Sequence, residues 1–279
     1  MVERLSIRAN GLTFKVLVEG EGPLVLMLHG FPDTAHTWNV VQPAVAALGF
    51  RVAAPFMRGY APTEIPPNGP FDADTLGDDA LALIDALGAD DAFVLGHDWG
   101  ASAAFSAAGL APEKVRLLLT MAIPHPARVL PTPSMLWAVR HFFSLNLPGA
   151  AARIRARDLA DIDLFVSRWS PAWQVPPEET RAAKESLRTP GSLEAAIGYY
   201  RALSPILPAS QKRKVVVPSV AFAGTEDNVQ PSAFERAASH YTAGYEVVSV
   251  PGGHFMHREH PQPFVDALVK VLRRYQRQL

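Results

Sequence analysis

Hydrophobic and polar positions follow two alternating regimes along the chain. Over residues 5–124, and again from residue 215 onward, short aliphatic or β-branched runs alternate with helical patterns. Over residues 125–212 prolines punctuate the chain, β-branched runs vanish and the apolar positions recur with a helical period. Because strands separated by single helices pair in parallel with helices on both faces, the first regime predicts an α/β fold. We therefore expect a core, residues 1–124 and 213–279, interrupted by a helical cap, residues 125–212.

Individual elements of the core follow from apolar runs and from helical stretches that end at glycine. A continuous apolar run such as residues 23–28 is typical of a strand covered on both faces. The helix expected at 75–87 is followed by Gly88, where a C-terminal glycine belongs. The expected strands are residues 23–28, 51–54, 92–95, 115–122, 215–223 and 245–250, and the expected helices are residues 37–48, 75–87, 99–110, 232–241 and 261–279.

Composition and charge exclude several classes of protein. Of the 279 residues 48% are hydrophobic and 19% are charged, so the chain can bury a substantial core. Lys and Arg number 26 against 27 Asp and Glu, which leaves no electrostatic footprint for nucleic acid or an anionic membrane. The chain has no Cys, and therefore no disulfide, thiolate nucleophile or thiolate metal site.

The first residues and the longest apolar stretch indicate where the protein is located and what it binds. The first residues carry charges where a signal peptide needs an apolar run, and the longest apolar stretch, about residues 99–111, is too short to span a bilayer. We therefore expect a cytoplasmic, globular protein that binds neither nucleic acid nor membrane and uses no cofactor.

The most specific motif is Gly96-His97-Asp98-Trp99-Gly100, which follows an expected strand and opens an expected helix. It has the form of a nucleophile elbow, in which the nucleophile stands on a strained turn between strand and helix. Side chains at the two glycines would collide with neighbouring backbone, and the helix N-terminus favours an ionised carboxylate. Asp98 is therefore the candidate nucleophile. The alternative is an aspartate that caps a helix after a glycine turn.

A second loop, His29-Gly30-Phe31-Pro32, also comes directly after an expected strand. In the hydrolase arrangement such a loop supplies one N–H group of an oxyanion hole, here that of Phe31. The residue after the nucleophile, Trp99, supplies the other. The alternative for this loop is a simple turn or a cis-proline loop with no part in catalysis.

An acid and a base follow later strands. Asp227 comes after the strand expected at 215–223, and His254 comes after the last expected strand. Asp98, Asp227 and His254 follow one another along the chain in the order nucleophile, acid and base that is found in hydrolases with such an elbow. Glu226 is the alternative acid.

Two further patterns suggest different chemistry. His254, His257 and His260 spell H-x-x-H-x-x-H, which invites a metal site. On a helix, however, the third His is rotated away from the first, and no Cys or clustered carboxylate completes the site. We expect no metal here, with His257 and His260 as surface or capping residues. Ser102 begins a helical turn after the strand has ended, so we do not expect it to be a nucleophile.

Taken together, these motifs resemble those of α/β-hydrolases in the branch of epoxide hydrolases and haloalkane dehalogenases, whose nucleophile is Asp. The resemblance covers essentially the whole chain and includes an RGYG-like turn at residues 58–60. It implies a mostly parallel eight-stranded sheet flanked by helices, with an inserted helical cap. It also implies an epoxide hydrolase that forms a covalent ester on Asp98. His254, oriented by Asp227, would activate the water that hydrolyses this ester.

The chain departs from the related families at a few positions. Haloalkane dehalogenases usually place Asn where this chain has Phe31, although Trp99 matches a halide-binding Trp of theirs. Fluoroacetate-type dehalogenases usually carry Arg where Trp99 stands, and family members usually have Asp where this chain has Phe56. Epoxide hydrolase is therefore the main hypothesis. The alternatives are a haloalkane dehalogenase, an ester or lactone hydrolase, and a non-catalytic ligand-binding protein.

The resemblance also assigns roles to residues of the cap. Typical members use two cap tyrosines as proton donors to the leaving alkoxide; Tyr200 matches the second, with Tyr199 as its adjacent rival. The first Tyr is absent, and our hypothesis is that His141 takes its place rather than being a surface histidine. Trp137, Phe142 and Tyr199 are expected to bind substrate. The apolar cap indicates a small apolar epoxide, and a monomer or homodimer.

Overall fold

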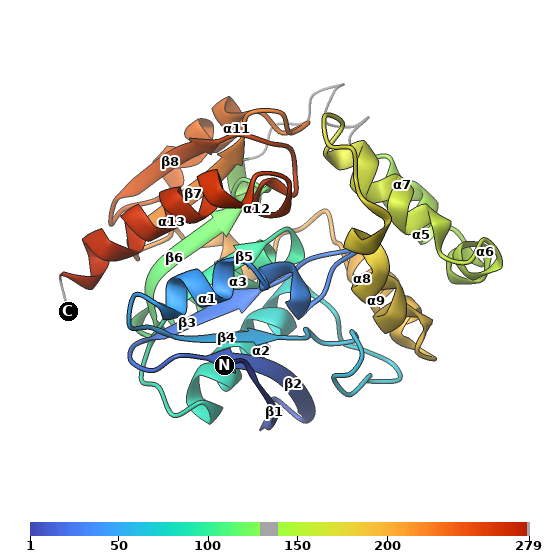
Figure 1. The fold of residues 1–279 in the computed structure, drawn as a ribbon, viewed down its shortest axis with the longest axis horizontal. Coiled ribbons are helices and arrows are strands. Elements are labelled where there is room, and N and C mark those ends of the chain that lie inside the picture. The colour runs from blue at the N-terminus through green and yellow to red at the C-terminus, as the bar shows by residue number, and fades with distance from the viewer. Residues whose placement is uncertain (129–138, 278–279) are drawn as a thin grey trace.

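The computed structural model describes residues 1–128 and 139–277. Within these residues, eight strands form one sheet in the order β1-β2-β4-β3-β5-β6-β7-β8 (Figure 1). The strands from β3 to β8 pair in parallel, whereas β2 pairs antiparallel with both β1 and β4. The strands are β1 (Glu3–Ala9), β2 (Leu12–Glu19), β3 (Leu24–Leu28), β4 (Arg51–Pro55), β5 (Ala92–His97), β6 (Val115–Met121), β7 (Ser219–Gly224) and β8 (Tyr245–Val250). The prediction of a mostly parallel eight-stranded sheet is confirmed.

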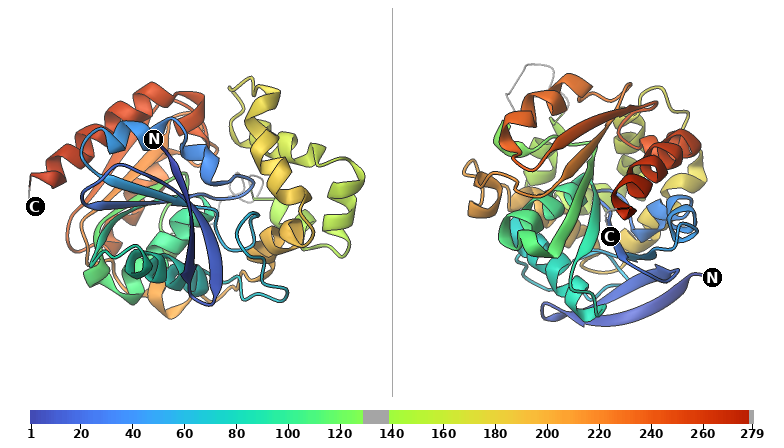
Figure 2. Two further views of the ribbon diagram at one scale, coloured as in Figure 1. Left: turned by 60° about the horizontal axis from the view of Figure 1, so that its bottom comes forward. Right: turned by 90° about the vertical axis from the view of Figure 1, so that its left-hand side faces the viewer.

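Helices cover both faces of this sheet because successive side chains of a strand point to opposite faces (Figures 1 and 2). In β3, Leu24 and Leu26 pack with α2 and α3, whereas Val25 and Met27 pack with α1 and α13. The core helices are α1 (Val41–Ala46), α2 (Ala73–Ala86), α3 (Trp99–Leu110), α11 (Pro231–Glu235), α12 (Met256–Glu259) and α13 (Pro261–Gln276), with 3₁₀ turns η1 (Ala35–Trp38), η2 (Pro112–Lys114) and η5 (Arg236–His240). A further 3₁₀ turn, η3 (Pro126–Arg128), lies in the segment expected to be the cap.

Several expected elements are shorter than predicted. The helix expected at 37–48 is divided into η1 and α1, and Pro43, which has no N–H to donate, lies in the first turn of α1. The strand expected from residue 215 begins only after Pro218, and the helix expected at 232–241 is α11 followed by η5. The sheet also gains an N-terminal hairpin that turns at Asn10 and Gly11, both with positive φ.

Between β6 and β7, the described residues 139–212 contain helices and turns and no strand. We call this segment the cap. Figures 1 and 2 show its helices α5 to α9 at one end of the sheet, beside the core, whereas α10 packs on α3 of the core. Its elements are α5 (His141–Asn146), α6 (Ala150–Ala156), α7 (Ala160–Trp169), η4 (Pro177–Thr180), α8 (Arg181–Arg188), α9 (Ser192–Arg201) and α10 (Ala209–Lys212).

Hydrogen bonds to the loop after β4 join the cap to the core. The Ser192 hydroxyl donates to the Gly59 carbonyl at 2.8 Å, and the Ser186 hydroxyl donates to the Ala61 carbonyl at 2.7 Å. Gly59 has φ +81° and an added Cβ would lie 2.6 Å from the Cβ of Ala195, so glycine lets the loop and α9 approach closely. The cap therefore packs on a core loop through buried polar contacts.

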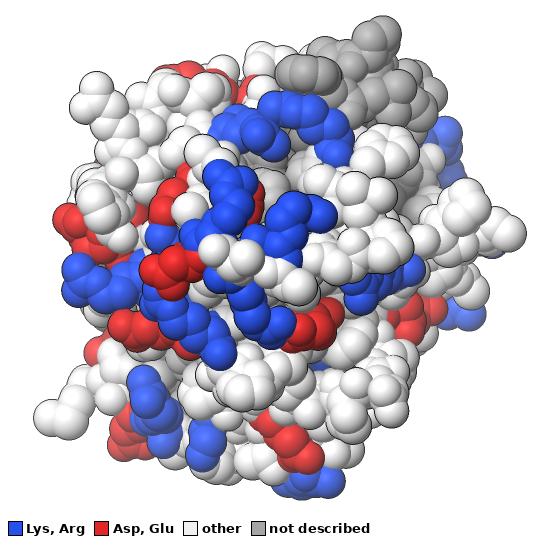
Figure 3. Space-filling view, turned by 90° about the vertical axis from the view of Figure 1, so that its right-hand side faces the viewer, with Lys and Arg blue, Asp and Glu red and all other residues white. Residues whose placement is uncertain are grey.

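The surface of the cap carries both signs of charge. Figure 3 shows basic and acidic side chains interspersed over this face, and ion pairs such as Arg188 with Asp158 join its helices. No helix among the described residues is long and apolar enough to cross a membrane.

Candidate active site

The nucleophile elbow has the backbone geometry that its glycines require. Asp98 lies between β5 and α3 with φ 52° and ψ −116°, a conformation that non-glycine residues rarely adopt. A Cβ added at Gly96 would overlap the carbonyl of Gly100, and one added at Gly100 would overlap the carbonyl of Leu28. Glycine at both positions therefore permits the sharp turn that presents Asp98 at the end of the strand.

One oxygen of Asp98 is already bound by the loop after β3. The Phe31 N–H donates to Asp98 Oδ1 at 2.9 Å. Gly30 makes this approach possible, because an added Cβ there would lie 2.5 Å from the same oxygen. The Trp99 N–H belongs to the first turn of α3, where backbone N–H groups have no partner within the helix. Burial raises the pKa of Asp98, but His254, His97 and the Phe31 N–H together hold it below its ordinary value, so the group is a carboxylate.

His254 lies between two carboxylates. Its Nε2 is 3.7 Å from Asp98 Oδ2 and its Nδ1 is 3.4 Å from Asp227 Oδ2. Burial lowers the pKa of His254, but the two carboxylates outweigh that effect and raise it to about 9. At neutral pH the resting site therefore holds His254 as an imidazolium.

The loops after β7 and β8 decide which acid faces His254. Asp227 is buried, and its Oδ1 accepts the Val229 N–H at 3.0 Å, which leaves Oδ2 for the imidazole. Glu226, the alternative acid, is exposed. The backbone N–H of His254 donates to the Trp169 carbonyl at 3.1 Å, so α7 of the cap helps to hold the loop.

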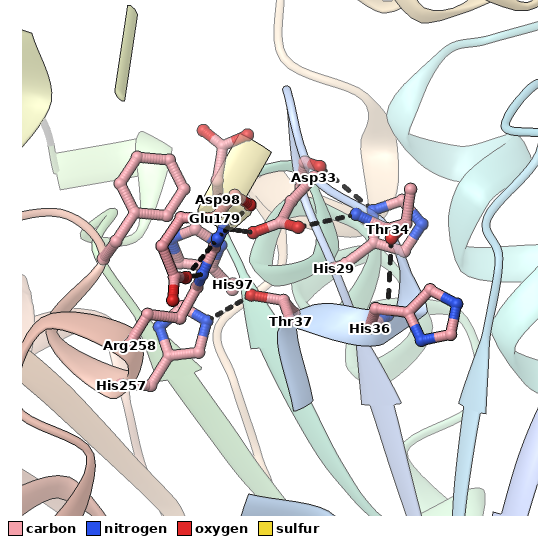
Figure 4. A network of polar contacts seen from close by, with 12 residues as sticks. His29, Asp33, Thr34, His36, Thr37, His97, Asp98, Glu179, His257 and Arg258 are labelled. Carbon is pink, nitrogen blue, oxygen red and sulfur yellow. Dashed lines mark hydrogen bonds and ion pairs between the residues drawn. The ribbon is translucent and has the colours of Figure 1, made fainter. Parts of the chain in front are cut away.

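The expectation that His257 lies at the surface is wrong. Its side chain is fully buried, with Nε2 2.6 Å from the Thr37 hydroxyl and its ring 4.9 Å from that of His97 (Figure 4). His257 is the second residue of α12, and together with Met256 it lies on the side of this short helix that faces the core. His97 Nε2 lies 3.0 Å from the His254 carbonyl and so supports the loop that carries His254. No group of metal-ligating side chains occurs among the described residues.

Aromatic side chains from the cap enclose the carboxylate. The Tyr200 ring lies 5.3 Å from Phe31 and 5.2 Å from Trp99. Burial, with the charge of Asp98, raises the pKa of Tyr200 well above its usual value, so the side chain is a phenol. The buried His141 ring lies 5.5 Å from Tyr200. The structure therefore brings Tyr200 and His141 together beside the loop that binds Asp98.

The other expected substrate-binding residues differ in position. The Tyr199 hydroxyl donates to the Arg58 carbonyl at 2.6 Å, so it is engaged in joining α9 to the core. Phe142 is half-buried, with its ring 5.0 Å from Tyr200. Trp137 lies outside the described residues. Phe56, which stands where an Asp was expected, is buried with its ring 5.3 Å from His36.

Sequence reasoning missed two aromatic residues of α7. Trp169 lies 4.6 Å from His141 and 5.4 Å from His254, and Phe165 stacks on Trp169 at 5.6 Å. Both are buried and four residues apart, so they share one face of the helix. That spacing was visible in the sequence, but it did not indicate which surface the face would meet.

The parallel sheet, the elbow and the order of the three polar residues define a hydrolase of the α/β class. The chain belongs to the alpha/beta hydrolase fold family, whose model matches residues 23–261. It is 30% identical to the AB hydrolase superfamily protein YfhM of Bacillus subtilis over 91% of this chain and 92% of that protein. It is 28% identical to Epoxide hydrolase A of Mycobacterium tuberculosis over 97% of each chain. The solved structure of epoxide hydrolase CorEH without ligand is similar, with a TM-score of 0.81, 26% identity, and coverage of 97% of this chain and 98% of that one.

Proposed function

We propose that this protein hydrolyses apolar epoxides to vicinal diols through a covalent ester on Asp98, with residues 125–212 acting as the cap over the site. One arrangement carries the proposal: the Phe31 N–H binds Asp98 Oδ1 while Oδ2 faces His254, and the phenol of Tyr200 lies beside this pair. The relatives named as epoxide hydrolases support the substrate class.

In the first half-reaction Asp98 Oδ2 attacks an epoxide carbon, and the bond from that carbon to the ring oxygen breaks. The electron pair stays on the ring oxygen as an alkoxide, which takes a proton from Tyr200. Although burial raises the pKa of Tyr200, an alkoxide is a stronger base than a phenolate, so the transfer remains favourable. We assign His141 as the second donor, because its ring packs against that of Tyr200.

Ester formation then changes the charge around His254. One of the two carboxylates that hold its pKa at about 9 becomes neutral, so the pKa of His254 falls and its proton restores the Tyr200 phenol. The neutral imidazole removes a proton from water, and the resulting hydroxide attacks the carbonyl carbon of the ester. Asp98 Oδ1 becomes the oxyanion, bound by the N–H groups of Phe31 and Trp99. Collapse breaks the bond from the carbonyl carbon to the alkyl-bearing oxygen, and the departing alkoxide takes the proton of the new Asp98 carboxyl group. The diol leaves, Asp98 is again a carboxylate, and His254 keeps the proton that it took from water for the next cycle.

Trapping the ester tests this sequence of steps. His254→Gln retains the nucleophile and the oxyanion donors but lacks the base, so incubation with styrene oxide should add one substrate mass at Asp98. His260→Gln is the matched control, because it removes an imidazole six residues away that contacts neither carboxylate, and it should turn over normally. Asp98→Asn should give no adduct. If His254→Gln stays unmodified while the wild type is active, or if ¹⁸O from water never enters Asp98 over many turnovers, the mechanism is wrong.

A second candidate is dehalogenation of haloalkanes with the same three residues. The buried indole N–H of Trp99 has no hydrogen-bond partner among the described residues, and such a donor can bind a leaving halide. Against it, Phe31 has no side-chain donor to complete the halide site. A small panel separates the two functions: diol from styrene oxide supports the first, and halide released from 1-bromobutane supports the second.

A further inference from the structure

Arg258 connects three separate parts of the molecule around the site. Its Nη1 lies 2.6 Å from Asp33 Oδ2, in the turn that follows β3. Its Nε and Nη2 lie 2.9 Å and 2.5 Å from Glu179 Oε2, in η4 of the cap, and Nη2 also donates to the Glu179 carbonyl. Figure 4 shows the guanidinium between the two carboxylates. Arg258 itself lies in α12, four residues after His254. Its side chain therefore links the turn that carries Phe31, the segment that carries His254, and the cap.

Arg258 and Asp33 are buried within this arrangement, whereas the Glu179 side chain is 32% exposed. The Arg258 side chain is 10% exposed and that of Asp33 is 5% exposed. The guanidinium also lies 5.7 Å from the Trp173 ring and 5.8 Å from the Phe255 ring. Burial raises the pKa of Asp33, but Arg258 and neighbouring donors hold it below its ordinary value. A planar guanidinium that satisfies two carboxylates at once in a buried site is geometrically demanding, and Lys cannot reproduce its fork.

Asp33 belongs to the turn that carries the oxyanion donor. Its N–H donates to the Gly30 carbonyl at 2.9 Å, which closes the turn around Phe31. Its Oδ1 accepts the Thr34 N–H at 2.8 Å, so its Oδ2 is the oxygen that Arg258 binds. The direction of the Phe31 N–H, and with it the distance to Asp98 Oδ1, therefore depends on how Asp33 is held.

We propose that Arg258 is a positioning residue for hydrolysis of the covalent ester. Through Asp33 it fixes the Phe31 N–H on Asp98, and through Glu179 it holds the cap against the same turn. The inference rests on the proposed function. The alkylation step needs the Asp98 carboxylate and a proton donor to the epoxide oxygen. The hydrolysis step needs an oxyanion donor aligned with a base. Only this step therefore requires that the turn of Phe31 and the loop of His254 keep a fixed position relative to each other. Loss of the guanidinium fork should therefore slow hydrolysis more than alkylation.

The test measures the two steps separately, by rapid quench and intact mass with styrene oxide, well below the melting temperature of each variant. Arg258→Lys keeps the positive charge but loses the fork. We expect its ester hydrolysis to fall about tenfold or more, as misplacement of a catalytic group does, whereas its alkylation should fall no more than that of Glu179→Gln, which loses only the contact to the cap. The ester then becomes the main steady-state species. If Arg258→Lys is poorly folded, Asp33→Asn serves instead, with the same expected accumulation.

Two comparisons separate positioning from stability. Arg116 makes a bidentate contact with Asp91 at the partly exposed, opposite end of β5 and β6 from Asp98: its Nε lies 2.7 Å from Oδ1 and its Nη2 lies 2.6 Å from Oδ2. Arg116→Lys should lower stability slightly and leave both rate constants unchanged. Glu179→Gln keeps the contact between Arg258 and Asp33, so it should raise KM and leave ester hydrolysis within threefold of wild type. Equal loss of both steps in Arg258→Lys and Asp33→Asn, or no loss in either, would overturn the proposal.

Hydrogen exchange gives a readout that does not depend on activity. In Arg258→Lys, amides in the peptide that spans residues 29–34 should exchange faster than in wild type, whereas Arg116→Lys should leave them unchanged. Unchanged exchange in Arg258→Lys would show that Arg258 does not hold the turn. If the wild type forms no ester with any epoxide, the proposed function fails, and this measurement still decides whether Arg258 orders the turn.

Discussion

The proposed site has two sides. On the core side, backbone geometry holds the carboxylate proposed as nucleophile, whereas on the cap side aromatic packing holds the two side chains proposed as proton donors. Asp98 is fixed by a positive φ and by the Phe31 N–H at 2.9 Å, across contacts that only glycine allows. Tyr200 lies in α9 and His141 lies in α5, and their rings pack against each other. The Tyr200 ring also packs against Phe31 of the core, so only side-chain packing holds this side of the site in place. The covalent chemistry should therefore tolerate almost no change on the core side. The cap side should set the rate of ring opening.

The largest expected effect comes from crowding the core side. Gly30→Ala places a Cβ 2.5 Å from Asp98 Oδ1, which displaces either the carboxylate or the Phe31 N–H. Loss of one oxyanion donor lowers rates by about 10² to 10³. We expect a loss of this size in ester hydrolysis, measured by single-turnover decay of the covalent species. Gly11→Ala, where an added Cβ meets nothing within 4 Å, is the control for replacing a glycine away from the site. Normal decay in Gly30→Ala would contradict the backbone account.

The next effect separates two adjacent tyrosines of α9. Tyr200→Phe removes the proposed donor and should slow alkylation about 10²-fold, with little change in ester hydrolysis. Tyr199→Phe removes a buried hydrogen bond to the Arg58 carbonyl and should lower stability by about 1 kcal/mol. Pre-steady-state alkylation and denaturant unfolding measure the two outcomes. The reverse result, with Tyr199 controlling alkylation, would exchange their roles.

A third prediction concerns stability and pH on the core side. The folded pKa of His254 is about 9, above the unfolded value of about 6.5. The imidazolium therefore stabilises the fold fully below about pH 6.5, and this contribution is lost as pH rises through about 9. The difference in unfolding free energy between wild type and His254→Gln should shrink by roughly 3 kcal/mol over this window. Denaturant unfolding at pH 6 and pH 10 measures it. A difference that does not vary with pH would show that the two carboxylates do not hold a proton on His254.

The smallest expected effect tests His141 on the cap side. If His141 donates as an imidazolium, ring opening should fall with rising pH, and His141→Phe should lose that dependence together with up to about tenfold in rate. Single-turnover alkylation of both proteins across the pH range measures this. Indistinguishable profiles would leave Tyr200 as the donor and give His141 a packing role.

The core side of the site was largely predictable from the sequence, and the cap side was less so. The residues after β3, β5, β7 and β8 were identified from motifs that follow expected strands and from their order along the chain. The structure brings them together because the carboxyl ends of parallel strands meet at one edge. By contrast, the sequence did not predict that the Trp169 ring packs beside that of His254, or that His257 is buried. A helical period shows that a face is apolar, but it does not show what that face will cover.

The sequence by itself determined local backbone chemistry: where strands end, where glycine permits a sharp turn, and which residue stands at the elbow. These features depend on neighbours within a few positions, so their pattern is visible in a single chain. Only the tertiary structure decided that Arg258 meets Asp33, 225 positions away, and that Tyr200 rather than Tyr199 has its ring against Phe31. The reason is physical, because such contacts depend on how helices pack across the edge of a sheet. That packing is a property of the whole folded chain and not of any segment within it.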